Sequence, residues 1–114
     1  MASQYGFVVR TKNEDRWLGY CLQSIRDNFG MDSSVVVVDT ESDDETLSIA
    51  RMFGTGVKSI PKTEYRPGKA LNMGFEELDC DFVCCISAHC EVLKVSKTLE
   101  DYLKQSRCFG VMGK

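Results

Sequence analysis

The sequence of this 114-residue chain predicts an α/β fold of three layers, αβα, with a mostly parallel sheet of about five strands. Short β-branched runs alternate with amphipathic segments along the whole chain. The run at 34–39, SVVVVD, is apolar on both faces, as strands of a parallel sheet are. No linker, repeat or low-complexity tract interrupts this alternation. The length fits one domain spanning residues 1–114.

The expected elements follow one another as strand, helix, strand. Asn13 or Asp15 is a candidate cap of the first helix. Ser42 and Glu45 have the Ser-x-x-Glu spacing of a capping box for the second helix, which Gly54 would end. Strands are expected at 6–10, 34–39, 57–60, 81–86 and 108–112, and helices at 17–28, from about 42 to 53, from about 68 with Leu71, Phe75 and Leu78 on one side, and after 96.

Composition and charge exclude several classes of protein. The hydrophobic fraction of 43% and the charged fraction of 27% are typical of a soluble globular protein. A net charge of −3 does not favour nucleic acid or an anionic membrane. The longest apolar runs, VVVV and FVCCI, are much shorter than the roughly 18 residues of a membrane span. The N-terminal segment does not resemble a signal peptide, so we expect a cytoplasmic protein with reduced cysteines.

Polar segments follow each of the first four expected strands. Ligands of parallel sheets bind beyond the carboxyl ends of the strands, where these segments are expected to converge. Ligand-binding residues are therefore expected in RTKNE, DTESDD, PKTEYRPGK and SAHCE, at 10–14, 39–44, 61–69 and 87–91.

Two of these segments contain groups suited to a nucleotide. The carboxylate of Asp39 could accept a hydrogen bond from a nucleobase N–H or a ribose hydroxyl, or it could cap the turn that follows. Arg66 and Lys69 stand at the start of a helix, where free N–H groups and the helix dipole attract anions such as a diphosphate. The alternative for this pair is a solvated basic loop, and the spacing of a Walker loop is absent.

The cysteines around the single histidine do not form a convincing zinc motif. Cys84 and Cys85 would point to opposite faces of a strand, and both are expected in the core. Cys80 and Cys90 would lie roughly 30 Å apart if the chain between them is extended. A metal-binding or redox protein is therefore disfavoured, and His89 is left at the open end of the fourth strand.

Four blocks of the sequence resemble family 2 glycosyltransferases with the GT-A fold. In the commonest members the second block reads Val-Val-Asp-Asp-Gly-Ser-x-Asp-x-Thr, and the fourth ends in an Asp-x-Asp motif. The resemblance covers essentially the whole chain. The blocks are FVVRTKNEDRWLGYCLQSI, VVVVDTESDDETLSIARMFG, YRPGKALNMGFEEL and DFVCCISAHCEVL.

The resemblance implies that the chain binds a nucleoside diphosphate sugar. By position in the motifs, Thr11 and Glu14 would lie near the nucleoside and Asp39 would accept from the base. Arg66 and Lys69 would face the diphosphate. The last residue of the Asp-x-Asp motif normally helps to hold a divalent cation, Mn²⁺ or Mg²⁺, that bridges the two phosphates.

The chain departs from the family pattern at that motif. Ser87, Ala88 and His89 replace Asp-x-Asp, as in a subset of the family, and two negative charges are lost. Imidazole is a fair ligand for Mn²⁺ and a poorer one for Mg²⁺. Either a cation is held through His89 and the phosphates, or His89 donates to a phosphate directly, or His89 only ends the strand.

Members of the family run on well beyond this length, with an acceptor site and a general base in the second half. The sequence therefore predicts a truncated glycosyltransferase-like domain that transfers a sugar to an unknown acceptor hydroxyl, with its catalytic residue unknown. The alternative is an incomplete nucleotide-binding module without turnover. An exposed sheet edge and apolar helix faces predict a homo-oligomer.

Overall fold

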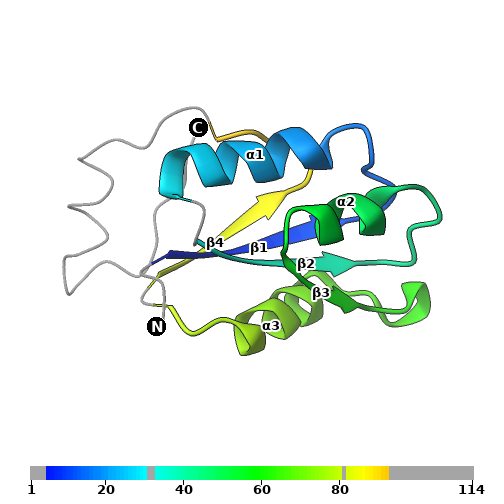
Figure 1. Ribbon diagram of the computed structural model, residues 1–114. Helices are drawn as coiled ribbons and strands as arrows, with labels where there is room; N and C mark the ends of the chain where they lie inside the picture. Colours follow the sequence, from blue (N-terminus) through cyan, green and yellow to red (C-terminus); the bar gives the residue numbers. More distant parts are fainter. Residues whose placement is uncertain (1–4, 31–32, 81, 93–114) are drawn as a thin grey trace.

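The computed structural model describes residues 5–30, 33–80 and 82–92 (Figure 1). The expected alternation of strands and helices is confirmed over this part of the chain. The fifth strand at 108–112 and the helix after 96 lie outside the described residues. The elements in order are β1 (Tyr5–Thr11), α1 (Leu18–Phe29), β2 (Ser34–Asp39), α2 (Thr46–Met52), β3 (Gly56–Ser59), the 3₁₀ helix η1 (Lys62–Glu64), α3 (Pro67–Glu77) and β4 (Phe82–Ser87).

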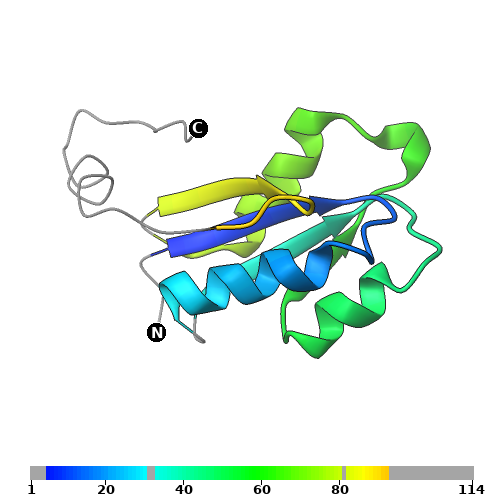
Figure 2. The same ribbon diagram turned by 90° about the horizontal axis from the view of Figure 1, so that it is seen from above.

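The four described strands form one parallel sheet in the order β3-β2-β1-β4. Thr11 pairs with Asp39, which in turn pairs with Ser59, and Arg10 pairs with Ser87. All four strands therefore end at the same edge of the sheet, which we call the carboxyl edge. Figure 2 shows β4 at one side of the sheet, next to β1.

Helices cover both faces of the sheet, as expected for three layers (Figure 1). In β1, Phe7 and Val9 point to the face covered by α1 and α2. Val8, which lies between them, points to the opposite face, covered by α3. β2 alternates in the same way, with Val35 and Val37 in the first cluster and Val36 and Val38 in the second. The VVVV run is thus buried on both faces, which confirms that it is a central strand.

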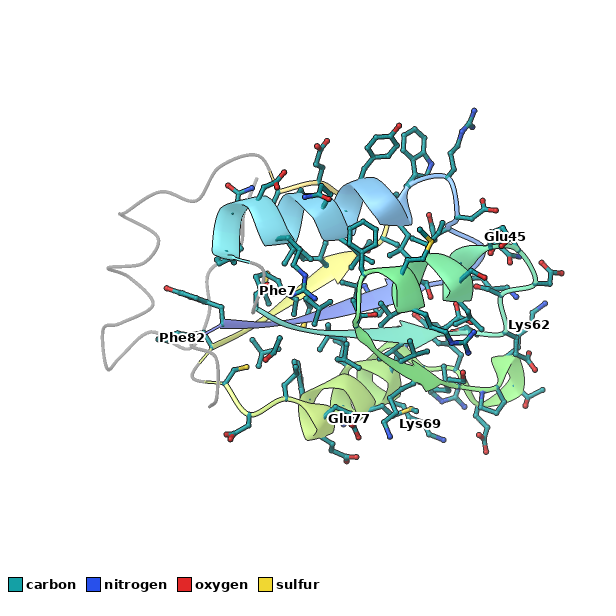
Figure 3. The ribbon with its side chains drawn as sticks, in the orientation of Figure 1. Phe7, Glu45, Lys62, Lys69, Glu77 and Phe82 are labelled. Carbon is teal, nitrogen blue, oxygen red and sulfur yellow. The ribbon has the colours of Figure 1, made fainter. Side chains whose placement is uncertain are left out.

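Helix α3 packs closely on the sheet because it carries a glycine at the contact. A Cβ atom at Gly74 would lie 2.5 Å from Val8 Cγ1 and 2.6 Å from Val8 Cγ2. Only a residue without a side chain fits there unless the helix moves away from the sheet. Figure 3 shows α3 running from Lys69, near the carboxyl edge, towards Glu77.

Both predicted N-terminal caps are wrong, whereas Gly54, with a φ of 70°, follows the end of α2 as predicted. α1 begins after Trp17, and α2 begins after Glu45, without a side-chain cap in either case. Asn13 and Asp15 instead bond to the loop after β2, and Ser42 bonds to Asp39. Because these polar side chains form hydrogen bonds within and between the loops, they do not cap the helices.

Two predictions of burial are also wrong. Cys84 and Cys85 are exposed, because β4 forms one edge of the described sheet and is not enclosed between helices as β1 and β2 are. Phe75 of α3 is 41% exposed, because Ala70 and Gly74 make the contact with the sheet. Leu71 and Leu78 are partly buried against the α3 side of the core, as expected. In the described part of the chain, no helix has the length and apolar character needed to cross a membrane.

Candidate functional site

The candidate site lies at the carboxyl edge, where the loops after β1 and β2 are joined by hydrogen bonds. We call residues 12–17 and 40–45 the paired loops. The Lys12 ammonium donates to the Glu41 carbonyl at 2.9 Å. The Asn13 N–H donates to Ser42 Oγ at 2.8 Å, and the Asp43 N–H donates back to Asn13 Oδ1 at 2.9 Å. The loops therefore hold each other in place by reciprocal bonds.

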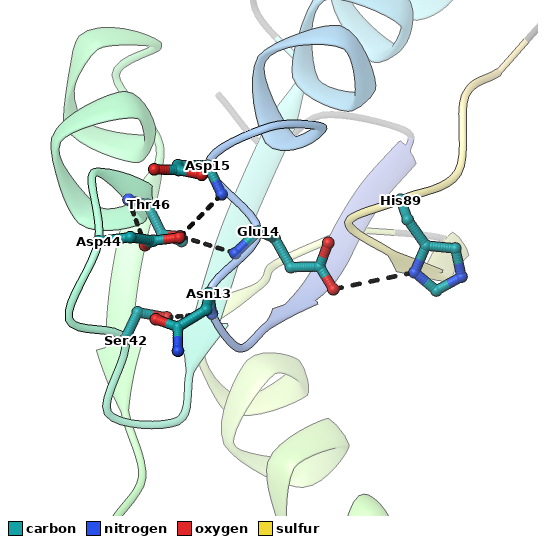
Figure 4. A network of polar contacts seen from close by, with 7 residues as sticks. All are labelled: Asn13, Glu14, Asp15, Ser42, Asp44, Thr46 and His89. Atoms are coloured by element: carbon teal, nitrogen blue, oxygen red, sulfur yellow. Dashed lines mark hydrogen bonds and ion pairs between the residues drawn. The ribbon is translucent and has the colours of Figure 1, made fainter.

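The same pairing continues towards α2 (Figure 4). The Glu14 N–H donates to Thr46 Oγ1 at 2.9 Å, and the Asp15 N–H donates to Asp44 Oδ2 at 3.2 Å. The Glu45 N–H donates to Asp15 Oδ2 at 3.4 Å. Because Thr46 is fully buried, this end of the paired loops is anchored in the core.

Asp39 holds the base of the paired loops. The residue is 1% exposed, and its carboxylate accepts from the hydroxyls of Thr11 and Ser42 at 2.5 Å each and from the Ser42 N–H at 2.9 Å. A carboxylate has about four acceptor positions, so this one is largely satisfied by the protein. Asp39 therefore caps the turn after β2 and fixes Thr11 beside it, whatever further bond it makes to a ligand.

Backbone strain marks the tips of the paired loops. Asn13 and Glu41 have φ values of 51° and 48°. Asparagine tolerates this left-handed region, whereas glutamate rarely adopts it. Glu41 is held there by two contacts, since its carboxylate accepts from the Lys62 N–H at 3.0 Å and its carbonyl accepts from Lys12. In the Val-Val-Asp-Asp-Gly-Ser-x-Asp-x-Thr motif given above, glycine occupies the position of Glu41.

The electrostatics of the paired loops centre on Asp44. Burial alone would raise the pKa of Asp44, but hydrogen bonds from Thr46 and Asp15 outweigh burial and hold that pKa below its ordinary value of 3.8. Thr46 donates to this carboxylate through both its N–H, at 2.9 Å, and its hydroxyl. The charged form of Asp44 is therefore part of the loop structure.

His89 also lies at the carboxyl edge, two residues after the end of β4. Its Nδ1 is 3.9 Å from Glu14 Oε1 (Figure 4). The histidine side chain is 63% exposed and the glutamate side chain 24% exposed. The structure therefore brings together two of the residues predicted to bind ligand, but as a pair that sequence reasoning did not foresee.

Arg66 and Lys69 stand at the N-terminal end of α3. Arg66 precedes the first turn in an extended conformation, and the first turn contains no acidic residue. Lys69 is half-exposed, with its ammonium 3.9 Å from Glu64 Oε2. α3 starts after η1, so both cations belong to the carboxyl edge, but the structure records no contact between them and Thr11, Asp39 or His89 in the part of the chain it describes.

Sequence reasoning did not single out Arg10. This residue lies near the end of β1, and its Nε is buried without a hydrogen-bond partner among the described residues. Partial desolvation by surrounding protein atoms raises the pKa of the Cys85 thiol although the residue is exposed, and the positive charge of Arg10 opposes that rise. A charged residue directly after an apolar strand run was the available signal.

A divalent cation fits this site only as an ion shared with a ligand. In the described ranges, no three His, Cys, Asp or Glu side chains gather as they would for a protein cage. His89 supplies one ring nitrogen, which Mn²⁺ accepts as a ligand when phosphate oxygens complete the coordination.

Comparison with known protein families identifies the family of this chain. A sequence model described as glycosyl transferase family 2 matches residues 7–111. The chain belongs to this family. The resemblance of its four blocks is thereby confirmed, and the paired loops, His89 and the start of α3 are parts of a family 2 domain.

Solved structures support the same fold. A structure of S. aureus TarS 1–349 in complex with UDP-GlcNAc is 25% identical, with a TM-score of 0.64 over 86% of this chain. The mannosyltransferase PcManGT from Pyrobaculum calidifontis, in complex with GDP-Man and Mn²⁺, is 26% identical, with a TM-score of 0.63 over 78% of this chain. Glucosyl-3-phosphoglycerate synthase from Mycobacterium tuberculosis is 19% identical, covers 91% of this chain at a TM-score of 0.68, and shows the fold alone.

The family 2 chain is short beside these structures. It spans 29% of the TarS 1–349 chain, 28% of the mannosyltransferase chain and 41% of the synthase chain. No curated protein sequence matches it.

Proposed function

We propose that this domain binds a nucleoside diphosphate sugar at the carboxyl edge and presents the sugar for transfer to an acceptor hydroxyl. The observation that supports it most is the family match over residues 7–111, combined with loops that gather polar groups where parallel sheets bind ligands. The structures of TarS with UDP-GlcNAc and of the mannosyltransferase with GDP-Man point to the same class of donor.

In this proposal, residues predicted from the sequence contact different parts of the ligand. Thr11 lies beside the nucleoside, and Asp39 orients Thr11 and Ser42 as well as offering an acceptor to the base. Arg66 and Lys69 attract the diphosphate together with the free N–H groups of the first turn of α3. These assignments are supported by place in the fold and by charge.

A divalent cation, Mn²⁺ or Mg²⁺, is proposed to bind with the donor. His89 would hold it together with the phosphates, and when bound such an ion neutralises the charge of the diphosphate leaving group. The mannosyltransferase structure, which contains both GDP-Man and Mn²⁺, supports this. The loss of the Asp-x-Asp carboxylates favours Mn²⁺ over Mg²⁺, because imidazole is the poorer ligand for Mg²⁺.

Two further proposals concern the state of the protein. We propose a cytoplasmic location, supported by the five cysteines of the described part, all of which are free thiols. We also propose a homo-oligomer, supported by the exposed apolar and thiol side chains of β4, Val83, Cys84 and Cys85.

Thermal unfolding with UDP- and GDP-sugars, with and without Mn²⁺, tests the proposed function. A ligand at 100 times its Kd should stabilise the protein by about 2.7 kcal/mol. Lys69→Gln should weaken binding because it removes a charge facing the diphosphate. Arg51→Gln removes an equal charge from the last turn of α2 and should leave binding unchanged.

The outcomes separate the hypotheses. If no nucleotide shifts the unfolding temperature, the proposed function is wrong. If nucleoside diphosphate is released only when an acceptor is present, the domain carries out transfer. Binding without any release would favour the alternative, a nucleotide-binding module without turnover.

A further inference from the structure

The pair formed by Glu14 and His89 suggests how the only histidine of the chain is oriented. His89 has two ring nitrogens, and in the neutral ring only one carries a proton. Nδ1 is the nitrogen that faces Glu14, at 3.9 Å from Oε1 (Figure 4). Whichever nitrogen keeps the proton decides whether the other can accept a cation.

The backbone on both sides of this pair is fixed. The Glu14 N–H donates to Thr46 Oγ1, and the Glu14 carbonyl accepts from the N–H groups of Trp17 and Leu18 at 3.1 and 2.9 Å. The only interaction recorded for the Glu14 carboxylate in the described residues is the one with His89. The carboxylate therefore extends from a rigid loop and remains available to the imidazole.

The turn that carries His89 is anchored just as firmly. Ala88 is 1% exposed, and its N–H donates to the Arg10 carbonyl at 3.3 Å. The Cys90 N–H donates to the Ser87 carbonyl at 2.9 Å. Beyond the turn, the Val92 N–H donates to Ser24 Oγ of α1 at 2.9 Å. A buried alanine thus presents the histidine to solvent at a defined point of the carboxyl edge.

We propose that Glu14 is a positioning residue for His89. Its carboxylate accepts the Nδ1–H, which holds the neutral imidazole in the tautomer whose Nε2 lone pair is free for a divalent cation on the diphosphate. Histidine ligands commonly donate their second nitrogen to a carboxylate in this way. The inference rests on the proposed function, and it changes the expected role of Glu14 from a contact with the nucleoside to a partner of His89.

Glu14 also partly restores the negative charge that the Ser-Ala-His sequence lacks. Replacement of Asp-x-Asp by Ser-Ala-His removes two carboxylates from the loop after β4. Glu14 returns one negative charge beside the imidazole, from the loop after β1. The separation of 3.9 Å is longer than a hydrogen bond and must shorten by about 1 Å to make one, a movement available to a side chain that is 63% exposed.

The tautomer can be measured directly, because His89 gives the only imidazole signal in the spectrum. Nitrogen-15 NMR of the neutral ring in the ligand-free protein should show the proton on Nδ1. Glu14→Ala should move it towards Nε2. Glu14→Gln keeps an acceptor oxygen and should retain the Nδ1–H form.

Cation affinity provides a second measurement. Mn²⁺ binding, followed by electron paramagnetic resonance with UDP or GDP present, should weaken about 10–100-fold in Glu14→Ala. Glu14→Gln should fall between this variant and the original chain. Glu76→Ala makes the same substitution at an exposed position in the last turn of α3 and should change neither the tautomer nor the affinity.

Two results would overturn the inference: an Nε2–H ring in the unsubstituted protein, or unchanged Mn²⁺ affinity in Glu14→Ala. If neither UDP nor GDP binds the unsubstituted protein, with or without Mn²⁺, the proposed function fails. The tautomer of the free protein would still test the pairing of Glu14 with His89, so the two failures are distinguishable.

Discussion

At the scale of single residues, Asp39 and Asp44 at the carboxyl edge accept hydrogen bonds from neighbouring hydroxyl and N–H groups. Asp39 is buried and accepts three hydrogen bonds, and Asp44 accepts from Thr46 and Asp15. Their negative charges therefore stabilise the paired loops before any ligand binds. Glu14 is different, because its carboxylate faces only His89 in the described residues.

The lowered pKa of Asp44 predicts a pH-dependent contribution to stability. Because its pKa is lower folded than unfolded, the contribution is present above the ordinary value of 3.8 and is lost as pH falls through the folded value. At neutral pH, Asp44→Asn should lower the free energy of unfolding by about 1 kcal/mol or less, since solvent screens this carboxylate. The difference should shrink as pH falls below 3.8.

Urea unfolding of the two proteins at several pH values measures this. Asp43→Asn, at an exposed position in the same loop, is the matched control and should show no such trend. An Asp44→Asn difference that stays constant from neutral to acid pH would contradict the prediction.

Several residue assignments could be made from sequence because strand ends are recognisable. Asp39 was placed correctly at the end of a buried strand, and His89 after the fourth. Their contact partners could not be predicted, because these lie far away in the sequence: Thr11 is 28 residues before Asp39, and Glu14 is 75 residues before His89. Such contacts depend on strand order, which residue patterns do not specify.

At the scale of elements, the position of α3 depends on its glycine. Gly74→Ala should destabilise the protein by about 1–3 kcal/mol, because the added methyl group would overlap Val8. Alanine is the better helix former, so intrinsic propensity alone predicts the opposite sign. The measurement is the free energy of unfolding in urea.

Gly68→Ala is the matched control in the same helix. A Cβ at Gly68 meets no atom within 4 Å, so this substitution should be neutral or stabilise by about 0.4–1 kcal/mol. Equal effects of the two substitutions would show that α3 does not pack on β1 through Gly74.

Helix boundaries show where sequence patterns are insufficient. The four described strands were predicted within one residue at each end, since β-branched runs report burial directly. The start of α2 was predicted near Ser42 and lies at Thr46, because Asp39 and Asn13 bind Ser42. A capping motif competes with tertiary hydrogen bonds, and here the bonds between the paired loops prevail.

At the scale of the whole molecule, β4 is one of the two edge strands of the described sheet. Val83 is 38% exposed and its neighbours Cys84 and Cys85 are exposed as well. Exposed strand edges favour pairing with another chain. We therefore expect a homo-oligomer in sedimentation at tens of micromolar, and expect Val83→Lys to dissociate it.

Met52→Lys is the control, since Met52 is 82% exposed but lies on α2, away from β4. A monomer in the unsubstituted protein would show the prediction of an oligomer to be wrong. An oligomer that survives Val83→Lys would place the contact elsewhere.

The fold class was predictable from sequence as a whole, since alternating strands and helices with a doubly buried strand allow few architectures. The exposure of β4 was not, because FVCCI has the composition of a core strand. Its place beside β1, in the order β3-β2-β1-β4, decides its exposure, and that order is a property of the assembled sheet.

The reciprocal bonds between residues 12–17 and 40–45 have a consequence for engineering. Each segment completes the other, so grafting one of them from a relative would leave donors and acceptors mismatched. Chimeras with relatives should therefore exchange both segments as a unit, together with Thr46, whose hydroxyl accepts from the Glu14 N–H.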